Sequence, residues 1–242
     1  MGIRAAAFAC IAVLSLFSCA KEEQPVPPKP AQRERLTVIR PKRPSMTPEQ
    51  RASLRFPEKM IAEIEAAAGA EAEPFFETIT GSSENLRGEK GIERQRLSGF
   101  SVRTAKADEV LATYGRSLRI KGYLLFRSQQ NYGKVPDVLT VIKGGNSYDI
   151  LRVQKTEAPS DKLDTKAIIA WLRERQKDAP FVITGAGQDF VEAQFVKQPA
   201  NMKGFARKVA AFSPDVLRES HSTVEKLAER MKRTNGFRLV WD

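Results

Sequence analysis

Apolar and polar positions along the chain follow two different spacings, one typical of strands and one typical of helices. Short runs rich in β-branched and aromatic residues predict strands over residues 75–79, 99–102, 122–126, 138–142, 148–153, 180–184, 190–196 and 237–241. Apolar side chains three and four positions apart predict helices over 57–68, 107–114, 165–172, 202–210 and 224–231. We therefore predict a single mixed α+β domain with short, mostly antiparallel strands and flanking helices.

Individual residues predict where some of these elements begin and end. Gly115 is the expected stop of the helix that begins near residue 107, because glycine is common just beyond a helix end. The glycine-containing stretch 143–147 predicts a hairpin between the strands at 138–142 and 148–153. Ser222, three residues before Glu225, predicts a capping box at the start of the last helix.

The N-terminus has the layout of a bacterial secretion signal. Arg4 precedes an uncharged apolar run, 5–17, which is short for a membrane span. The sequence Leu16-Phe17-Ser18-Cys19 at its end resembles a lipobox, although Phe17 departs from the small or aliphatic residue usual there. That resemblance implies cleavage between Ser18 and Cys19, with a diacylglycerol on the Cys19 thiol. A plain signal peptide cut nearby, or an apolar N-terminal helix, are the alternatives.

The lipobox resemblance also implies a location. Cys10 would leave with the signal peptide, residues 1–18, so that Cys19 is the only cysteine of the mature chain. Several acyl chains on one residue anchor a protein stably to a membrane. Ala20 follows the cysteine, where an Asp would be typical of inner-membrane retention. We therefore expect a lipid-anchored protein of the cell envelope, on the outer membrane and facing the periplasm in a Gram-negative cell.

The segment after the cysteine is predicted to be a tether. Residues 19–55 include seven prolines and little apolar periodicity, which favours a semi-rigid spacer. Within it, Thr47 and Gln50 have the spacing of a capping box that begins a short helix. We expect an N-terminal extension over 56–98 and the main domain over 99–242.

Charge gives little support for nucleic-acid binding once it is placed along the chain. The 40 Lys and Arg against 29 Asp and Glu give a net charge of +11. Residues 21–55 hold nine basic and four acidic side chains, while residues 56–242 hold 30 and 25. A basic spacer beside an anionic membrane is favourable, and the body is only mildly basic. We expect membrane contact through the lipid and no nucleic-acid partner.

The sequence assigns no catalytic residue, metal or cofactor. One histidine, His221, and two cysteines are too few for a site built from several His or Cys ligands. The glycines at 185 and 187 lack the spacing and the strand-to-helix context of a dinucleotide site. Carboxylates alone could support glycoside hydrolysis, and the candidates are Asp149, Asp189, Glu192, Asp215 and Asp242.

Several stretches in order resemble DUF 4253, a bacterial family of uncharacterised domains. They are residues 122–126, 148–151, 168–172, 185–192, 212–216, 223–228 and 239–242. The resemblance covers about 99–242. It implies structural roles and no activity: Asp189 fixes a turn, Pro214 and Asp215 begin a helical turn, and Trp241 and Asp242 end a last strand inserted in the sheet.

Three hypotheses about function follow. The first is a non-enzymatic protein-binding module held away from the membrane by the tether, with an immunity-type protein that masks a toxin as one biological form. The alternative is an envelope hydrolase that uses carboxylates on glycan or peptidoglycan. Two of the named carboxylates in one cleft would favour the hydrolase. A structural envelope lipoprotein without a specific ligand is a third hypothesis.

Overall fold

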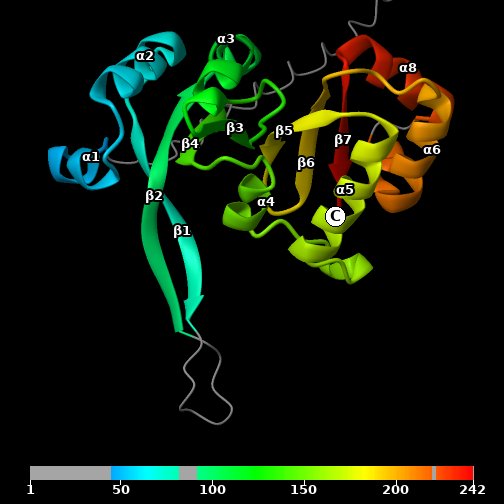
Figure 1. Ribbon diagram of the computed structural model, residues 1–242, viewed down its shortest axis with the longest axis horizontal. Helices are drawn as coiled ribbons and strands as arrows, with labels where there is room; N and C mark the ends of the chain where they lie inside the picture. Colours follow the sequence, from blue (N-terminus) through cyan, green and yellow to red (C-terminus); the bar gives the residue numbers. More distant parts are fainter. Residues whose placement is uncertain (1–44, 82–91, 220–221, 242) are drawn as a thin grey trace, which may run out of the picture. The chain divides into compact units, whose positions relative to one another are not determined.

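The computed structural model describes residues 45–81, 92–219 and 222–241, all of which belong to one compact unit (Figure 1). The predicted signal peptide, Cys19, His221, Asp242 and the polar stretch 82–91 lie outside the described residues. The helices are α1 (Pro48–Leu54), α2 (Glu58–Ala68), α3 (Ala107–Ile120), α4 (Asp149–Gln154), α5 (Thr165–Asp178), α6 (Met202–Phe212), α7 (Asp215–Glu219) and α8 (Val224–Thr234), with a 3-10 turn at Pro159–Asp161. The strands are β1 (Glu73–Gly81), β2 (Ile92–Thr104), β3 (Tyr123–Gln129), β4 (Asp137–Lys143), β5 (Phe181–Ala186), β6 (Phe190–Phe195) and β7 (Gly236–Val240).

The strands form one sheet in the order β1-β2-β4-β3-β5-β6-β7. All neighbouring pairs are antiparallel except β3 and β5, which run parallel and share the recorded pairing of Arg127 with Gly185. The predicted α+β class with mostly antiparallel strands is therefore confirmed. The parallel pair lies in the middle of the sheet and joins its two halves (Figure 1).

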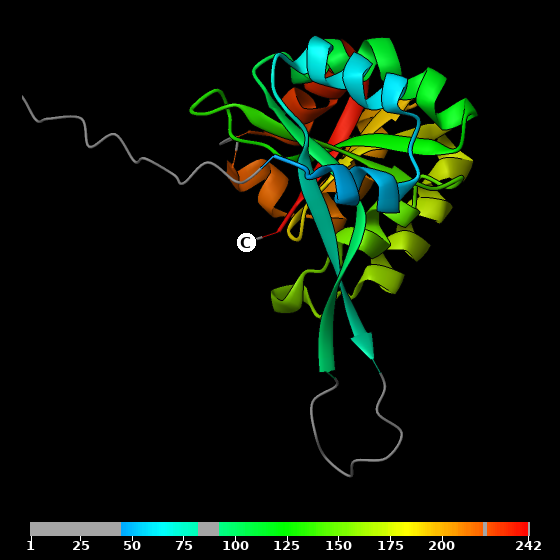
Figure 2. The same ribbon diagram turned by 90° about the vertical axis from the view of Figure 1, so that its left-hand side faces the viewer.

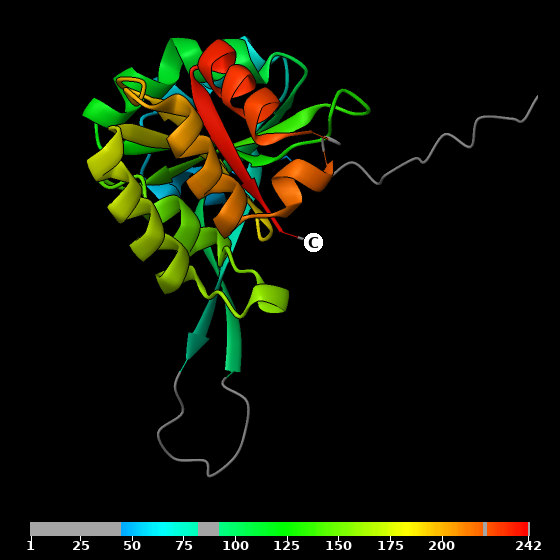
Figure 3. The same ribbon diagram turned by 90° about the vertical axis from the view of Figure 1, so that its right-hand side faces the viewer.

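Two apolar cores lie on opposite faces of the sheet. On β3, Leu124 and Phe126 belong to a core with α4, α5, α6 and α8, which we call the C-terminal core. Leu125, between them, belongs to a core with α1, α2 and α3, which we call the N-terminal core. Successive side chains of a strand point to opposite faces, so the two helical layers cover opposite sides. Figure 2 shows the layer of α1 to α3, and Figure 3 shows the layer of α4 to α8.

The folded body begins earlier than the sequence predicts. Residues 45–55, which the sequence assigns to the tether, are part of the folded body, because Met46 and Leu54 are buried in the N-terminal core. The predicted capping box of α1 is confirmed. The Thr47 hydroxyl accepts the N–H of Gln50, and the Gln50 side-chain oxygen accepts the N–H of Thr47. Likewise, β2 runs through the boundary expected at residue 98, so 56–98 and 99–242 share one sheet.

The predicted hairpin around residues 143–147 is wrong, because residues 149–154 form helix α4 and not a strand. The side-chain oxygen of Asn146 accepts the N–H of Tyr148 at 3.0 Å. The N–H of Asp149 also donates to the carbonyl of Asn146 at 2.9 Å, which winds the chain into a turn. Strand β4 pairs instead with β3 and β2.

Two helix ends also differ from prediction. Helix α3 continues through Gly115 to Ile120, because buried Leu118 extends the apolar stripe by one more turn. Helix α8 begins at Val224, as its predicted range has it, but its capping residue differs from the predicted one. Its cap is Thr223, whose hydroxyl accepts the N–H of Lys226, so Ser222 does not form the predicted capping box with Glu225.

Candidate functional site

The two parallel strands in the middle of the sheet place polar residues at their carboxyl ends. After β3 the chain turns to β4 on one side, and after β5 it turns to β6 on the other. In α/β sheets, ligands bind outside the carboxyl ends of strands whose connections diverge in this way. The loops 130–136 and 187–189 therefore frame the first place to look for a site.

Arg127 gathers three carboxylates at this edge. Its guanidinium lies 2.8 Å from Glu192 of β6 and 3.0 Å from Asp137 of β4, and it also pairs with Asp108 in the first turn of α3. Only 9% of the Arg127 side chain is exposed. A second guanidinium, that of Arg238 on β7, lies over the ring of Phe190. We call these residues the Arg127 cluster.

Burial and charge oppose each other in the Arg127 cluster. Burial raises the pKa of Glu192, and the positive charges of Arg127 and Arg238 offset this only in part. Burial alone would lower the pKa of Arg127, but the charges of Glu192 and Asp108 outweigh it, so that the pKa of Arg127 is raised. The guanidinium therefore stays charged and holds the carboxylates in place.

Gly185 allows the side chain of Glu192 and the backbone of Arg127 to lie close to β5. A Cβ atom at this position would lie 2.8 Å from Oε2 of Glu192 and 3.1 Å from the carbonyl oxygen of Arg127. Glu192 is held by Arg127, so it has little freedom to move aside. The glycine at 185 is thus needed for close packing at the end of β5. The stretch 185–187 is not expected to bind a dinucleotide, and this packing role agrees with that expectation.

A hollow of about 270 Å³ lies beside the cluster. Its lining residues are Thr104, Ala105, Gly133, Lys134, Val135, Pro136 and Asp137. Asp137 is the only member of the Arg127 cluster among these residues, and one of its oxygens faces Arg127. The hollow contains one carboxylate already engaged in an ion pair, which is poor geometry for paired acid and base catalysis.

The four described candidate carboxylates lie apart in different structural settings. Asp149 pairs with Arg152 on α4, Glu192 belongs to the Arg127 cluster, Asp189 is exposed in the β5–β6 turn, and Asp215 is buried and pairs with Arg218. None of these four carboxylates lines this hollow. Within residues 45–81, 92–219 and 222–241, no group of three His, Cys, Asp or Glu side chains is arranged to hold a metal ion.

The residues that the family resemblance singles out, among them Asp189, Pro214 and Trp241, lie around the C-terminal strand β7. The carbonyl of Asp189 accepts the N–H of Trp241 at 2.9 Å, so Asp189 acts there through its backbone. Trp241 is 2% exposed. The hydroxyl of Ser213, just before Pro214, donates to the carbonyl of Val240 and accepts its N–H. Helix α7 begins at Asp215, directly after this contact.

A second surface, which sequence reasoning missed, is a basic helical face made of α5, α6 and α8. These helices lie together over the C-terminal core (Figure 3). They carry four acidic side chains, Glu174, Asp178, Glu225 and Glu229. Their eleven basic side chains are Lys166, Arg173, Arg175, Lys177, Lys203, Arg207, Lys208, Lys226, Arg230, Lys232 and Arg233.

The basic helical face accounts for the positive charge of the whole body. The rest of residues 56–242 carries nineteen basic and twenty-one acidic side chains. Counting charge over the three predicted helices would have revealed this imbalance from the sequence. That all three helices lie on one side of the sheet could be learned only from the structure.

Part of the chain matches the model of a known family. Residues 138–242 match the model of a family described as "Domain of unknown function (DUF4253)". The match supports the resemblance over those residues and begins at Val138, later than the expected Gly99. Comparison with curated proteins and with solved structures gave no match. Among the described residues, no helix has both the length and the apolarity needed to cross a membrane.

Proposed function

We propose that this protein is a lipid-anchored protein of the bacterial cell envelope whose folded body binds another protein without catalysing a reaction. The observation that carries the proposal is the basic helical face, where eleven basic side chains meet four acidic ones. Charge concentrated on one face steers an oppositely charged partner and sets its orientation. The expected partner is therefore a protein with an acidic surface.

The anchor is supported by the N-terminal sequence. A positive residue, an apolar run and Leu16-Phe17-Ser18-Cys19 have the order expected of a lipoprotein signal. The tether would run from Cys19 to the start of the folded body at Ser45. Labelled palmitate should appear on the wild-type chain and be absent from Cys19→Ala. Label on both chains, or on neither, would contradict the anchor.

An immunity-type protein is one biological form of this proposal. Such a protein masks a toxin by covering its surface, which requires a binding face and no catalytic group. The described carboxylates are engaged in ion pairs or lie apart, and this arrangement does not favour the hydrolase hypothesis. A toxin gene next to the gene for this chain is the expected neighbour.

The test is capture of a partner from living cells by chemical crosslinking of the full chain. An epitope tag belongs in the tether, because Trp241 is buried and a C-terminal tag would disturb it. The first variant replaces four exposed side chains of the basic helical face by Gln: Arg173, Lys177, Lys226 and Lys232. The control replaces four exposed side chains on the opposite side of the sheet by Gln: Lys59, Lys106, Arg116 and Lys121.

The expected result is one acidic protein crosslinked to the wild type and to the control, and lost from the face variant. Both variants change the net charge by the same amount, so a general charge effect would weaken both equally. Equal capture by all three chains, or no reproducible partner, would overturn the proposal.

A further inference from the structure

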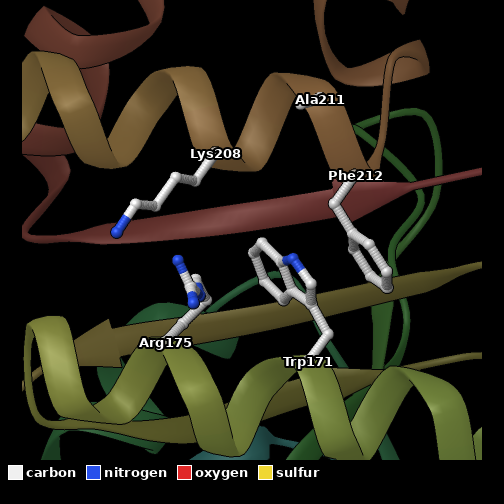
Figure 4. Close-up of a pocket in the computed structure, with 5 residues that line it drawn as sticks. All are labelled: Trp171, Arg175, Lys208, Ala211 and Phe212. Carbon is white, nitrogen blue, oxygen red and sulfur yellow. The ribbon is translucent and has the colours of Figure 1, made fainter.

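A hollow of about 300 Å³ lies between α5 and α6 within the basic helical face. Its lining residues are Trp171, Arg175, Lys208, Ala211 and Phe212. Figure 4 shows Trp171 and Arg175 rising from α5 toward α6, while Lys208 and Phe212 reach down from α6. The four long side chains therefore converge on one space from two helices.

The aromatic wall of this hollow is fixed in place. The rings of Trp171 and Phe212 stack at 4.3 Å with an angle of 7° between their planes. Phe212 in turn meets the ring of Trp241 edge to face at 5.9 Å, and Trp241 is buried in the C-terminal core. Because Trp171 is held through this stack, its orientation does not depend on a ligand.

The cations of the hollow exceed the negative charge that faces them. Nη1 of Arg175 and Nζ of Lys208 approach the same oxygen of Asp178, at 3.0 and 2.9 Å. Nε of Arg175 is buried and has no hydrogen-bond acceptor in the described part of the chain. The guanidinium of Arg175 also lies 5.6 Å from the ring centre of Trp171, which keeps it beside the aromatic wall. One carboxylate thus serves two cations, and a second carboxylate would complete the charge balance.

We propose that this hollow seats a carboxylate side chain from an acidic segment of the protein partner, between Arg175 and Lys208 and against Trp171. The inference rests on the proposed function and specifies its binding site. An arginine fork beside a lysine suits a carboxylate, and the aromatic wall suits the apolar part of the incoming side chain. Lys166, Arg173 and Arg207 continue the positive charge along both helices, so the face matches a run of acidic residues.

A lipid headgroup shares the anionic chemistry but is less well supported. Surfaces that insert into membranes carry exposed large apolar side chains. In the described part of the chain these side chains are Phe76, Ile79, Ile120, Tyr132, Val135 and Val196. None of them belongs to α5 or α6. A concave site between two helices also fits a protruding side chain better than a flat bilayer.

The test measures binding of a fluorescein-labelled peptide of alternating Glu and Leu to the purified full chain in detergent, by fluorescence anisotropy. The matching Gln and Leu peptide is the neutral probe. Acrylamide quenching of tryptophan supplies a second readout, because half-buried Trp171 is accessible while Trp241 is 2% exposed. Bound peptide should protect Trp171 from acrylamide.

The pocket variant is Arg175→Gln with Lys208→Gln, and its matched control is Lys166→Gln with Arg207→Gln. Both remove two positive charges from α5 and α6, but the control residues do not line the hollow. The pocket variant should weaken peptide binding about tenfold or more, while the control should weaken it about twofold. Lys208→Gln alone tests the same site with little risk to folding, because the Lys208 side chain is about half exposed.

Two results would overturn the inference. Equal weakening by the pocket variant and the control would show that diffuse charge, and not the hollow, binds the peptide, and the proposed function would survive it. Binding of phosphatidylglycerol vesicles that depends on Arg175 and Lys208, without peptide binding, would assign the hollow to lipid. Failure of the proposed function is detected separately, by the crosslinking experiment in cells, as equal capture by all three chains or as no reproducible partner.

Discussion

Arg127 on β3 and Glu192 on β6 form an ion pair across β5, with Nη1 2.8 Å from Oε2. The pair spans the one place where neighbouring strands run parallel, and where the recorded pairing is limited to Arg127 with Gly185. Asp108 and Asp137 bind the same guanidinium from α3 and β4. Side chains from both halves of the sheet thus meet at one buried cation.

This arrangement indicates a structural role for the Arg127 cluster. A sheet with little backbone pairing at its centre needs other contacts to hold its halves together. The C-terminal core supplies such contacts on one face of the sheet, because it contains Phe126 of β3 and Ile183 of β5, whereas the strand residues of the N-terminal core come from β2, β3 and β4. Arg127 connects elements from both halves, and its partners leave no free carboxylate in the neighbouring hollow.

Replacing Arg127 by Ala should strongly destabilise the protein. It leaves Glu192, whose side chain is 13% exposed, without its nearest cation. Removing one partner of a buried ion pair typically costs about 3–5 kcal/mol of the free energy of unfolding. Urea unfolding followed by circular dichroism measures this. The control is Lys177→Ala, whose ion pair with Glu174 is on the surface, with the two side chains 75% and 51% exposed, and should cost under about 1 kcal/mol. Equal small losses in both variants would contradict the role of Arg127.

Glu192 should make stability depend on pH in a particular direction. Burial raises its pKa above 4.5, the ordinary value that applies in the unfolded chain. The folded chain therefore keeps a proton where the unfolded chain has lost it. The contribution of Glu192 to the free energy of unfolding is fully present below 4.5 and is lost as pH rises through the folded-state pKa.

Glu192→Gln should remove this part of the pH dependence. Urea unfolding of both chains, at pH values from about 4 to about 8, should show the wild type losing stability relative to the variant as pH rises. Parallel stability curves for the two chains would show that Glu192 does not titrate as its burial indicates.

Two glycines should respond to the same substitution in opposite ways. At Gly185, a Cβ would lie 2.8 Å from Oε2 of Glu192, so Gly185→Ala should cost about 1–3 kcal/mol through overpacking. At Gly115, within α3, a Cβ meets no atom within 4 Å. Gly115→Ala should therefore stabilise the protein by about 0.5–1 kcal/mol, because alanine is the better helix former. Melting temperatures measure both, and shifts of the same sign would contradict this account.

The sequence predicted elements whose apolar spacing repeats over several turns, and it failed where single side chains decide. Ile61 and Ile64 place α2 correctly because their spacing fits a helix and no strand. The run from Tyr148 to Val153 fits a helix and a strand equally well, and the turn at Asn146 favours the helix. Such a contact contributes a single hydrogen bond, and the spacing of the apolar residues gives no sign of it.

The Arg127 cluster shows why much of the candidate site could not be predicted. Glu192 was named as a candidate carboxylate, but its partner Arg127 lies 65 residues away in the sequence. Asp189, only three positions from Glu192, is exposed and belongs to a turn. Which of two nearby carboxylates becomes buried depends on strand order, and the chain order of strands does not reveal that β5 lies between β3 and β6.

The C-terminal strand should be essential for stability. Leu239, Val240 and Trp241 are all buried, and the Trp241 N–H donates to the carbonyl of Asp189. Deleting residues 239–242 should therefore lower the melting temperature markedly. Trp241→Ala isolates the largest part of this effect, since removing a buried Trp side chain typically costs about 3–5 kcal/mol.

The control for Trp241→Ala is Val196→Ala, because Val196 is 70% exposed and follows β6, the neighbour of β7 in the sheet. An exposed side chain of this kind changes stability by about 0.5 kcal/mol or less. Both variants shorten an apolar side chain near the same edge of the sheet, so only burial separates them. A melting temperature of Trp241→Ala equal to that of Val196→Ala would contradict the insertion of Trp241 in the C-terminal core.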